Sequence, residues 1–597
     1  MEVDDNMRYA ADPRQKDLID LASTMFSPMA IKYMRQDWPG LFRTQILHLM
    51  PVGEIAKNFH PTLGCPTKEL YGMAGLIFLK EFFNLTIEEA VRRYLTSGDW
   101  QYALNVVPTT ASMSHASIER YMKCFVEDEI AVEVFHRVTS ALIEALELDV
   151  SRQRLDSTHV FSDMATFGRS KLMGVTIKRF LTQLKRHHHQ QYDELDDELR
   201  GRYAPSQAKM FADFTGGRKQ LRQTVAEDLL FMVNRFAEDD AVANRASYKA
   251  MVRVLEQQCE VSEEKVEVKD ETDGEDKDNT DGEVQTKTVV ELKAKTGGNV
   301  MQNPSDPEAT YDGHKGPGYQ TQISETCSQS NEVQLITGVE VEPAHKSDQD
   351  ALEPMLDQLD EHGRKPEIMY ADGGYGRDEN AVSTDQRGVD LQSPVGGPTP
   401  QNQDDLTVDD FAIDERSETV ERCPNGCKPQ SSTHDADTGK TTTVMRPEDC
   451  SRCRFASQCP VNKTAGRFVL HHTPSQRRLA ARRAEQSTGA FKEHYAFRAG
   501  GESVNSGVKR RTGMGRLRTR GHPRVSMAVL LRCAGWNVMR ALAALKKRGI
   551  RDFVTPASLI RRIINDFRRL RFAASGLTIG PPPIFRQFSP LPVLTAA

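Results

Sequence analysis

The stretch Tyr495-Ala-Phe-Arg498-Ala-Gly-Gly-Glu502-Ser-Val-Asn-Ser-Gly-Val-Lys509 decides how this sequence is interpreted. Its polar residues follow the spacing Y-x2-R-x3-E-x6-K. On a single helix of about 100° per residue, all four would lie within an arc of about 60°. A solvated charged face is one interpretation of this pattern. The other is an acid that meets a metal ion beside a polyanion, because this carboxylate stands alone among cations.

The composition is typical of a globular chain with several domains. At 597 residues the chain exceeds one hydrophobic core, and about three or four domains are expected. Apolar residues make up 38% and charged residues 27%. No apolar run of about 18 residues is present, so we expect no membrane span. The acidic start lacks a signal-peptide core, and ten cysteines are too few for a disulfide scaffold, so we expect a cytoplasmic protein.

Charge is distributed unevenly along the chain. Residues 464–572 contain 25 Lys and Arg against 5 Asp and Glu, a balance of +20, so the net charge of −6 leaves −26 for the remainder. Residues 259–284 contain 12 acids and 3 bases, a balance of −9. This asymmetry favours a carboxyl-terminal third that binds nucleic acid over a set of merely solvated basic helices.

The hydrophobic pattern changes along the chain. Residues 36–148 are predicted to be helical, either a helical bundle or a helix-turn-helix that reads DNA. A strand is predicted at 154–161, helices at 166–257, and a disordered linker or loop at 259–284. Strands at 319–325, 333–342, 367–372 and 389–395, with a helix at 348–362, complete the pattern. This order predicts an α/β layer fold.

Two aspartates stand at or near the ends of predicted strands, Asp156 in the first and Asp372 in the fourth. Strand carboxyl ends face the ligand crevice in open α/β sheets. Together with Glu502 they form a hard-oxygen set suited to Mg²⁺ or Mn²⁺, which can clamp a phosphodiester. The alternative for each aspartate is an ordinary turn cap.

Five cysteines cluster between the second aspartate and the glutamate. They are Cys423, Cys427, Cys450, Cys453 and Cys459. The spacing is close to that of a zinc ribbon, which suggests a structural Zn²⁺ site. Free thiols are the alternative, because the first pair has an x3 spacing and five ligands compete for four places.

Three blocks of the sequence resemble bacterial insertion-sequence transposases of the DDE type. These are Asp156-Ser-Thr, Ala371-Asp-Gly-Gly-Tyr375 and the quoted stretch, which matches the Y-R-E-K signature at all four positions. The segment from Leu41 to Phe125 resembles the helical InsH-type domain that precedes the core in that family. The resemblance covers about residues 30–550 and implies an α/β fold with an RNase H-like core.

The resemblance implies roles for individual residues. Asp156, Asp372 and Glu502 would be the catalytic metal ligands. The residues implied to bind DNA phosphates are Tyr495, Arg498, Lys509, Arg510, Arg511, Arg516, Arg518 and Arg520. Asn537 matches a recurrent Asn whose role the sequence does not give. Gly500 and Gly501 cost a helix roughly 1–2 kcal/mol, so we predict that it starts, bends or becomes ordered there.

The resemblance further implies a function. Such a protein would bind terminal inverted repeats in double-stranded DNA as a homodimer in the bacterial cytoplasm at the nucleoid. It would hydrolyse phosphodiesters at the element ends and join the 3′-hydroxyls to target DNA. A catalytically silent DNA-binding descendant, and a metal-dependent nuclease without strand transfer, are the alternatives.

The expected organisation divides the chain into seven parts. They are a flexible amino terminus (1–30), a helical amino-terminal DNA-binding domain (31–150), the catalytic core (151–165, 304–400 and 464–550), a helical insertion (166–258), an acidic linker (259–303), a cysteine-rich insertion (401–463), and a basic helix with a Pro-rich tail (551–597).

Overall fold

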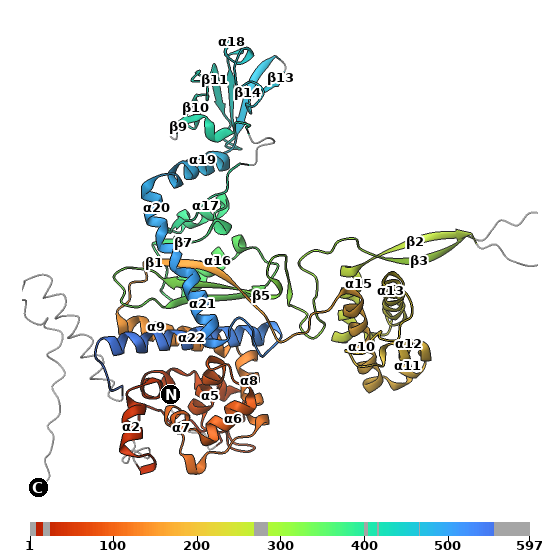
Figure 1. Ribbon diagram of the computed structural model, residues 1–597, viewed down its shortest axis with the longest axis vertical. Coiled ribbons are helices and arrows are strands. Elements are labelled where there is room, and N and C mark those ends of the chain that lie inside the picture. Colours follow the sequence, from red (N-terminus) through yellow and green to blue (C-terminus); the bar gives the residue numbers. More distant parts are fainter. Residues whose placement is uncertain are drawn as a thin grey trace, which may run out of the picture.

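The computed structural model describes residues 7–15, 24–267, 284–398, 404–414, 417–464 and 466–553. Most of the predicted basic helix and Pro-rich tail, and parts of the expected flexible amino terminus, lie outside these residues. A mixed β-sheet occupies the middle of the molecule, with the amino-terminal helices on one side of it (Figure 1). A helical insertion and a cysteine-containing β unit extend from it in two different directions.

The central sheet has six strands, and a core of five runs in the order β6-β5-β1-β7-β8. β5 pairs antiparallel with β1 and β6, whereas β1 pairs parallel with β7, and β7 with β8. The short β4 pairs with the start of β5. The strands are β1 (Arg152–Val160), β4 (Thr310–Asp312), β5 (Gly316–Thr326), β6 (Ile336–Pro343), β7 (Ile368–Tyr370) and β8 (Asp390–Gln392). Strands are thus found where alternation predicted them.

Both faces of the sheet are covered, as the alternation of its side chains requires. Leu155 points to the face covered by α16 (Leu352–Glu361), near which α17 (Asp378–Gln386) lies. Val160 and Ile323 point to the other face and join a core that includes α21 (Gly501–Thr512) and α22 (His522–Lys547).

The amino-terminal helices share that core with the sheet, because α22 packs against both α9 and α5 as well as β6. Local signals set helix starts: Thr86 forms a capping box with Glu89, and Ser114 caps α8. The helices are α2 (Pro28–Arg35), α3 (Trp38–Leu41), α4 (Val52–Lys57), α5 (Leu70–Phe82), α6 (Ile87–Thr96), α7 (Gly98–Ala103), α8 (His115–Glu127) and α9 (Ile130–Leu146).

Helix α22 is long and apolar enough, by length and composition, to cross a membrane. In the structure, 78% of that apolar window is buried inside the protein itself. Asn537 on this helix donates from Nδ2 to the Ile336 carbonyl at 2.7 Å, and its Oδ1 accepts from the Ile336 amide at 2.8 Å. This gives the recurrent asparagine a structural role, because it joins α22 to β6.

The helical insertion, which lies between β1 and β4 in the sequence, forms a separate apolar core. Its helices are α10 (Arg169–His187), α11 (His189–Asp193), α12 (Asp197–Tyr203), α13 (Arg218–Arg235), α14 (Asp240–Ala243) and α15 (Ala246–Gln258). It lies to one side of the sheet and ends in a two-stranded ribbon (Figure 1).

The prediction of a disordered linker or loop at residues 259–284 is wrong at its two ends, where β2 forms and β3 begins. β2 (Cys259–Glu267) and β3 (Val284–Leu292) form an antiparallel ladder, while residues 268–283 lie outside the described part. The ladder pairs its own backbone groups, so the acidic chain needs few apolar anchors. Cys259 and Val290 supply such anchors, because both are buried in the core of the insertion.

The cysteine-containing unit holds a four-stranded sheet and a strand pair. The strands are β9 (Ala412–Asp414), β10 (Thr419–Arg422), β11 (Ser431–His434), β12 (Thr441–Met445), β13 (Asn462–Thr464) and β14 (Arg467–His472). Because β14 pairs with β12 and β13, the return to the central sheet begins only at α19 (Pro474–Gln486). α19 and α20 (Gly489–Tyr495) then lead back to the sheet (Figure 1).

Candidate active site

Asp156 and Asp372 lie at the same level, just past the point where the pairing of the parallel strands β1 and β7 ends. Asp372 follows the last residue of β7 by two positions. Asp156 follows Arg154, the last β1 residue that pairs with β7, by two positions. Asp156 is nevertheless in the middle of β1, not near its end, because β5 continues to pair with β1 as far as Val160.

Asp372 also performs the turn-capping role that was the alternative for it. Its Oδ1 accepts a hydrogen bond from the Gly374 amide at 2.8 Å and caps the 3-10 helix Gly373–Tyr375. Its Oδ2 is directed elsewhere and lies 3.7 Å from Nη2 of Arg498. Capping thus uses one oxygen of this carboxylate and leaves the other for the site.

Arg498 lies among all three predicted catalytic carboxylates. Its Nη2 is 3.4 Å from Oδ1 of Asp156 and 3.7 Å from Oδ2 of Asp372. Its Nη1 is 3.9 Å from Oε1 of Glu502. The structure therefore brings the three acids together around one guanidinium, although the first and the last of them lie more than three hundred residues apart in the chain.

The carboxylates differ in their environments. Glu502 has 78% of its side chain exposed, whereas Asp156 has 15% exposed. Burial raises the pKa of Asp156, Arg498 opposes this rise, and the charges of Asp372 and Glu502 add to it. The site thus concentrates more negative charge than its one guanidinium neutralises.

The decisive stretch does not form one helix, so the prediction of a single face within a 60° arc is wrong. Tyr495 ends α20, residues Ala496–Gly500 form a 3-10 helix, and α21 begins at Gly501. The predicted start or bend at the glycines is found. Arg498 and Glu502 meet across this break instead of along one helix.

Close packing against β1 explains Gly500 but not Gly501. A Cβ on Gly500 would lie 1.9 Å from Nη1 of Arg154, whereas one on Gly501 would make an ordinary contact of 3.6 Å with Asp156. Arg154 in turn donates to the Phe497 carbonyl at 3.3 Å and is paired with Glu325. Both glycines weaken the helix, and Gly500 lets this segment approach the strand that carries Asp156.

Tyr495 and Lys509 both lie near the carboxylates. The Tyr495 ring stacks on Phe491 with the ring centroids 5.6 Å apart. Burial raises the pKa of Tyr495, Arg498 opposes this rise, and the charges of Asp372 and Asp156 add to it. Burial, and then the charge of Lys315, lower the pKa of Lys509, while Asp156 opposes this. Lys315 was not predicted as a site residue, although it stands in a turn beside β5.

The remaining predicted phosphate contacts form an exposed basic track along the last turn of α21 and the segment after it. Arg516 lies over the Phe161 ring at 5.8 Å, and Arg518 lies 3.9 Å from Glu89. These two arginines line a cavity of about 640 Å³ together with the loop between α5 and α6, the segment after β1 and the start of β5. The exposed members of the track are Arg510, Arg511, Arg516, Arg518 and Arg520.

Sequence reasoning missed Asn505 as a site residue. Its Nδ2 donates to Oδ2 of Asp156 at 3.0 Å, and the side chain is buried. The signal was present in the decisive stretch, because a residue three positions after Glu502 on a helix lies close to the same face. Asn505 holds the orientation of Asp156 from α21.

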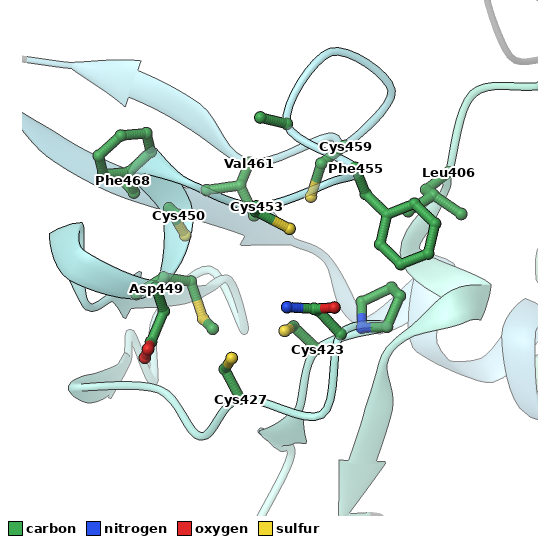
Figure 2. A pocket seen from close by; sticks show the side chains of 14 residues that line it. Leu406, Cys423, Cys427, Asp449, Cys450, Cys453, Phe455, Cys459, Val461 and Phe468 are labelled. Atoms are coloured by element: carbon green, nitrogen blue, oxygen red, sulfur yellow. The ribbon is translucent and has the colours of Figure 1, made fainter.

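The five clustered cysteines line one small cavity of about 40 Å³. Figure 2 shows their sulfur atoms around a common space, with Cys423 and Cys427 on one side of it. These two cysteines form a tight turn in which the Cys423 amide donates to the Cys427 carbonyl at 3.0 Å. Burial, followed by the neighbouring thiols, raises the pKa of Cys450 to about 11. All ten cysteines are free.

Both clusters have donor atoms that suit a metal, oxygen for Mg²⁺ or Mn²⁺ and sulfur for Zn²⁺. In the part of the chain that the structure describes, however, no group of three or more His, Cys, Asp or Glu side chains is arranged to hold a metal ion. For the carboxylates the reason is visible, because the guanidinium of Arg498 lies among them.

Residues 422–542 match a family model described as a transposase DDE domain. This match supports a DDE-type transposase. The matched range includes Arg498 and Glu502 as well as the five clustered cysteines, while Asp156 and Asp372 lie before it. Searches of curated proteins and of solved structures gave no match.

Proposed function

We propose that this protein is a DNA transposase that binds the terminal inverted repeats of an insertion sequence, cleaves the element ends and joins the 3′-hydroxyls to target DNA. The observation that carries the proposal is the convergence of Asp156, Asp372 and Glu502 on one cationic centre. The family match over residues 422–542 supports the same class of enzyme.

The proposed catalytic core is RNase H-like. Its support is the sheet, in which three antiparallel strands are followed by two parallel ones in the order β6-β5-β1-β7-β8. This order puts the first aspartate on the central strand and the second just after the end of its parallel neighbour. Helix α21 then brings the glutamate to the same edge of the sheet.

Asp156, Asp372 and Glu502 would hold Mg²⁺ or Mn²⁺. Such ions, when bound, supply Lewis-acid activation of water or of a 3′-hydroxyl at a phosphodiester. Residues of the chain itself orient the metal ligands and the DNA. Asn505 fixes Asp156, Gly500 lets the segment before α21 approach Arg154 of β1, and the exposed arginines after α21 hold the DNA backbone through its phosphates.

The partner is double-stranded DNA, bound by a homodimer because two element ends must be brought together. The InsH-like amino-terminal helices would take part in end recognition, and the cytoplasm with its nucleoid is the proposed location. The cavity between Arg516, Arg518 and the amino-terminal helices supports joint use of both regions. The cysteine cluster is proposed to hold one structural Zn²⁺.

Glu502→Gln tests the function most directly. We expect it to reduce cleavage of DNA that carries the element end by more than about a hundredfold, while DNA affinity stays within a few-fold. Glu493→Gln is the matched control, because Glu493 is an exposed glutamate on the neighbouring α20. The measurement is strand cleavage and electrophoretic mobility shift on the same DNA.

The outcomes separate the alternatives. Full cleavage by Glu502→Gln would remove this residue from the active site. Absence of cleavage in the wild-type protein, with intact binding to end DNA, would indicate a silent DNA-binding descendant. Cleavage without joined products in a strand-transfer assay would indicate a nuclease.

A further inference from the structure

The contacts of Arg498 differ from those of Arg478, which also pairs with a carboxylate. Arg478 grips Asp378 with two parallel hydrogen bonds, at 2.9 Å from Nε and 2.6 Å from Nη2. This is the strong bidentate geometry of an arginine–carboxylate pair. Arg498 instead is shared among three acids at 3.4–3.9 Å.

This sharing leaves Arg498 loosely held. Its only hydrogen bond to a carboxylate within the described structure is the long one to Asp156, at 3.4 Å. Its Nε is buried and has no hydrogen-bond partner among the described residues. A buried donor without a partner is unfavourable, so this arrangement is easier to leave than a bidentate pair.

The backbone around Arg498 is suited to movement. The residue lies on the 3-10 helix Ala496–Gly500, between the ends of α20 and α21. Short 3-10 segments between helices often act as hinges, and two glycines follow at once. A change in the Arg498 side chain can redirect the guanidinium without moving β1 or α21.

We propose that Arg498 is the internal counterion of the carboxylate site. In this role Arg498 competes with the divalent cation for the three carboxylates, and it leaves them when its guanidinium binds a DNA phosphate. Arg498 is then a positioning residue that couples metal loading to DNA binding. This inference rests on the proposed function, since it concerns the same three carboxylates. It also accounts for a site with a suitable donor set whose described arrangement does not fit a metal.

The charge balance supports this exchange. Three carboxylates face one guanidinium, so removing Arg498 strengthens the attraction of the site for a divalent cation. A phosphate accepts the planar fork of arginine as readily as a carboxylate does. Binding of a DNA phosphate therefore favours binding of the divalent cation, and by thermodynamic linkage binding of the cation must favour binding of DNA to the same extent.

The test is the affinity for Mn²⁺ without DNA, measured by isothermal titration calorimetry and by the electron paramagnetic resonance signal of free Mn²⁺. We expect Arg498→Gln to bind Mn²⁺ at least about fivefold more tightly than wild type. Arg498→Lys, which keeps the charge, should remain near wild type. Lys492→Gln is the matched control for loss of an exposed positive charge on the neighbouring α20.

A second measurement uses a short mixed-sequence DNA duplex. Duplex DNA should tighten Mn²⁺ binding to the wild-type protein and should do so less in Arg498→Gln. Unchanged or weaker Mn²⁺ binding in Arg498→Gln, with the Asp156→Asn variant losing Mn²⁺, would overturn the counterion role and leave the proposed metal site intact. If Asp156→Asn keeps full Mn²⁺ binding, both the counterion role and the proposed metal site are wrong.

Discussion

The carboxylate cluster and the cysteine cluster are two sets of metal-type ligands in different states of charge balance. The carboxylates have a cation among them, because Arg498 lies within 4 Å of each. The cysteines face one another, and burial followed by the neighbouring thiols raises the pKa of Cys450 to about 11. A side chain neutralises part of the charge of one cluster, whereas in the other burial favours the neutral form of the Cys450 thiol.

This difference determines what each site must release in order to bind a metal. The cysteines must release protons, so metal binding there depends on pH and contributes to folding of the unit. The carboxylates must release Arg498, so metal binding there depends on what else the arginine can bind. A structural site and a catalytic site need these different properties, and three predictions test the contrast.

The largest expected effect is that of Asp156→Asn, which should reduce cleavage by more than about a hundredfold and yet stabilise the protein without metal. Burial raises the pKa of Asp156 above its ordinary value of 3.8. The ionised form therefore lowers the free energy of unfolding at neutral pH, and this penalty is lost as the pH falls through the raised pKa towards 3.8.

Urea unfolding of both proteins in a chelator checks the sign. Asp156→Asn should be the more stable at about pH 7, and the two should converge at about pH 4. Arg498 keeps Asp372 and Glu502 as partners in the variant. Asp357→Asn is the control, because that carboxylate is exposed and pairs with Arg387. A variant that is less stable at neutral pH would show that Asp156 is held by its contacts rather than strained by burial.

The next effect concerns the cysteine cluster. Cys450→Ser should lose bound zinc and lower the melting temperature of the cysteine-containing unit by more than about 5 °C. Cys65→Ser is the control, because Cys65 is exposed and far from the cluster in sequence. Metal content by mass spectrometry and a calorimetric scan with and without chelator provide the measurement. Wild-type protein that contains no zinc would identify the cluster as free thiols.

The sequence predicted the parts of the fold that depend on local pattern. The hydrophobic pattern placed β5, β6, β7 and β8, and the residues predicted to be helical, 36–148, contain α5 to α9. Gly500 and Gly501 correctly indicated a break, since backbone freedom is a local property. The acidic ribbon of β2 and β3 was missed, because backbone pairing stabilises it with few apolar side chains.

The site was predictable as a list of residues but not as an arrangement. Asp156, Asp372 and Glu502 were named from strand ends and spacing, and they do converge. The central place of Arg498 was not foreseen, because a continuous helix would have put it beside Glu502 alone. Asn505 was overlooked for a similar reason, since its contact with Asp156 depends on how α21 packs against β1.

The smallest expected effect tests the basic track independently of the carboxylate cluster. Arg511 is exposed at the end of α21, where its charge is free to meet a phosphate. Arg511→Ala should weaken DNA binding a few-fold for all sequences and reduce the slope of log affinity against log salt by about one. Lys547→Ala is the matched control, because it removes an exposed charge at the far end of α22. Equal changes in slope for the two variants would mean that DNA affinity depends on net charge and not on this track. A change confined to Arg511→Ala would instead extend the DNA path from the carboxylates along α21 to Arg511.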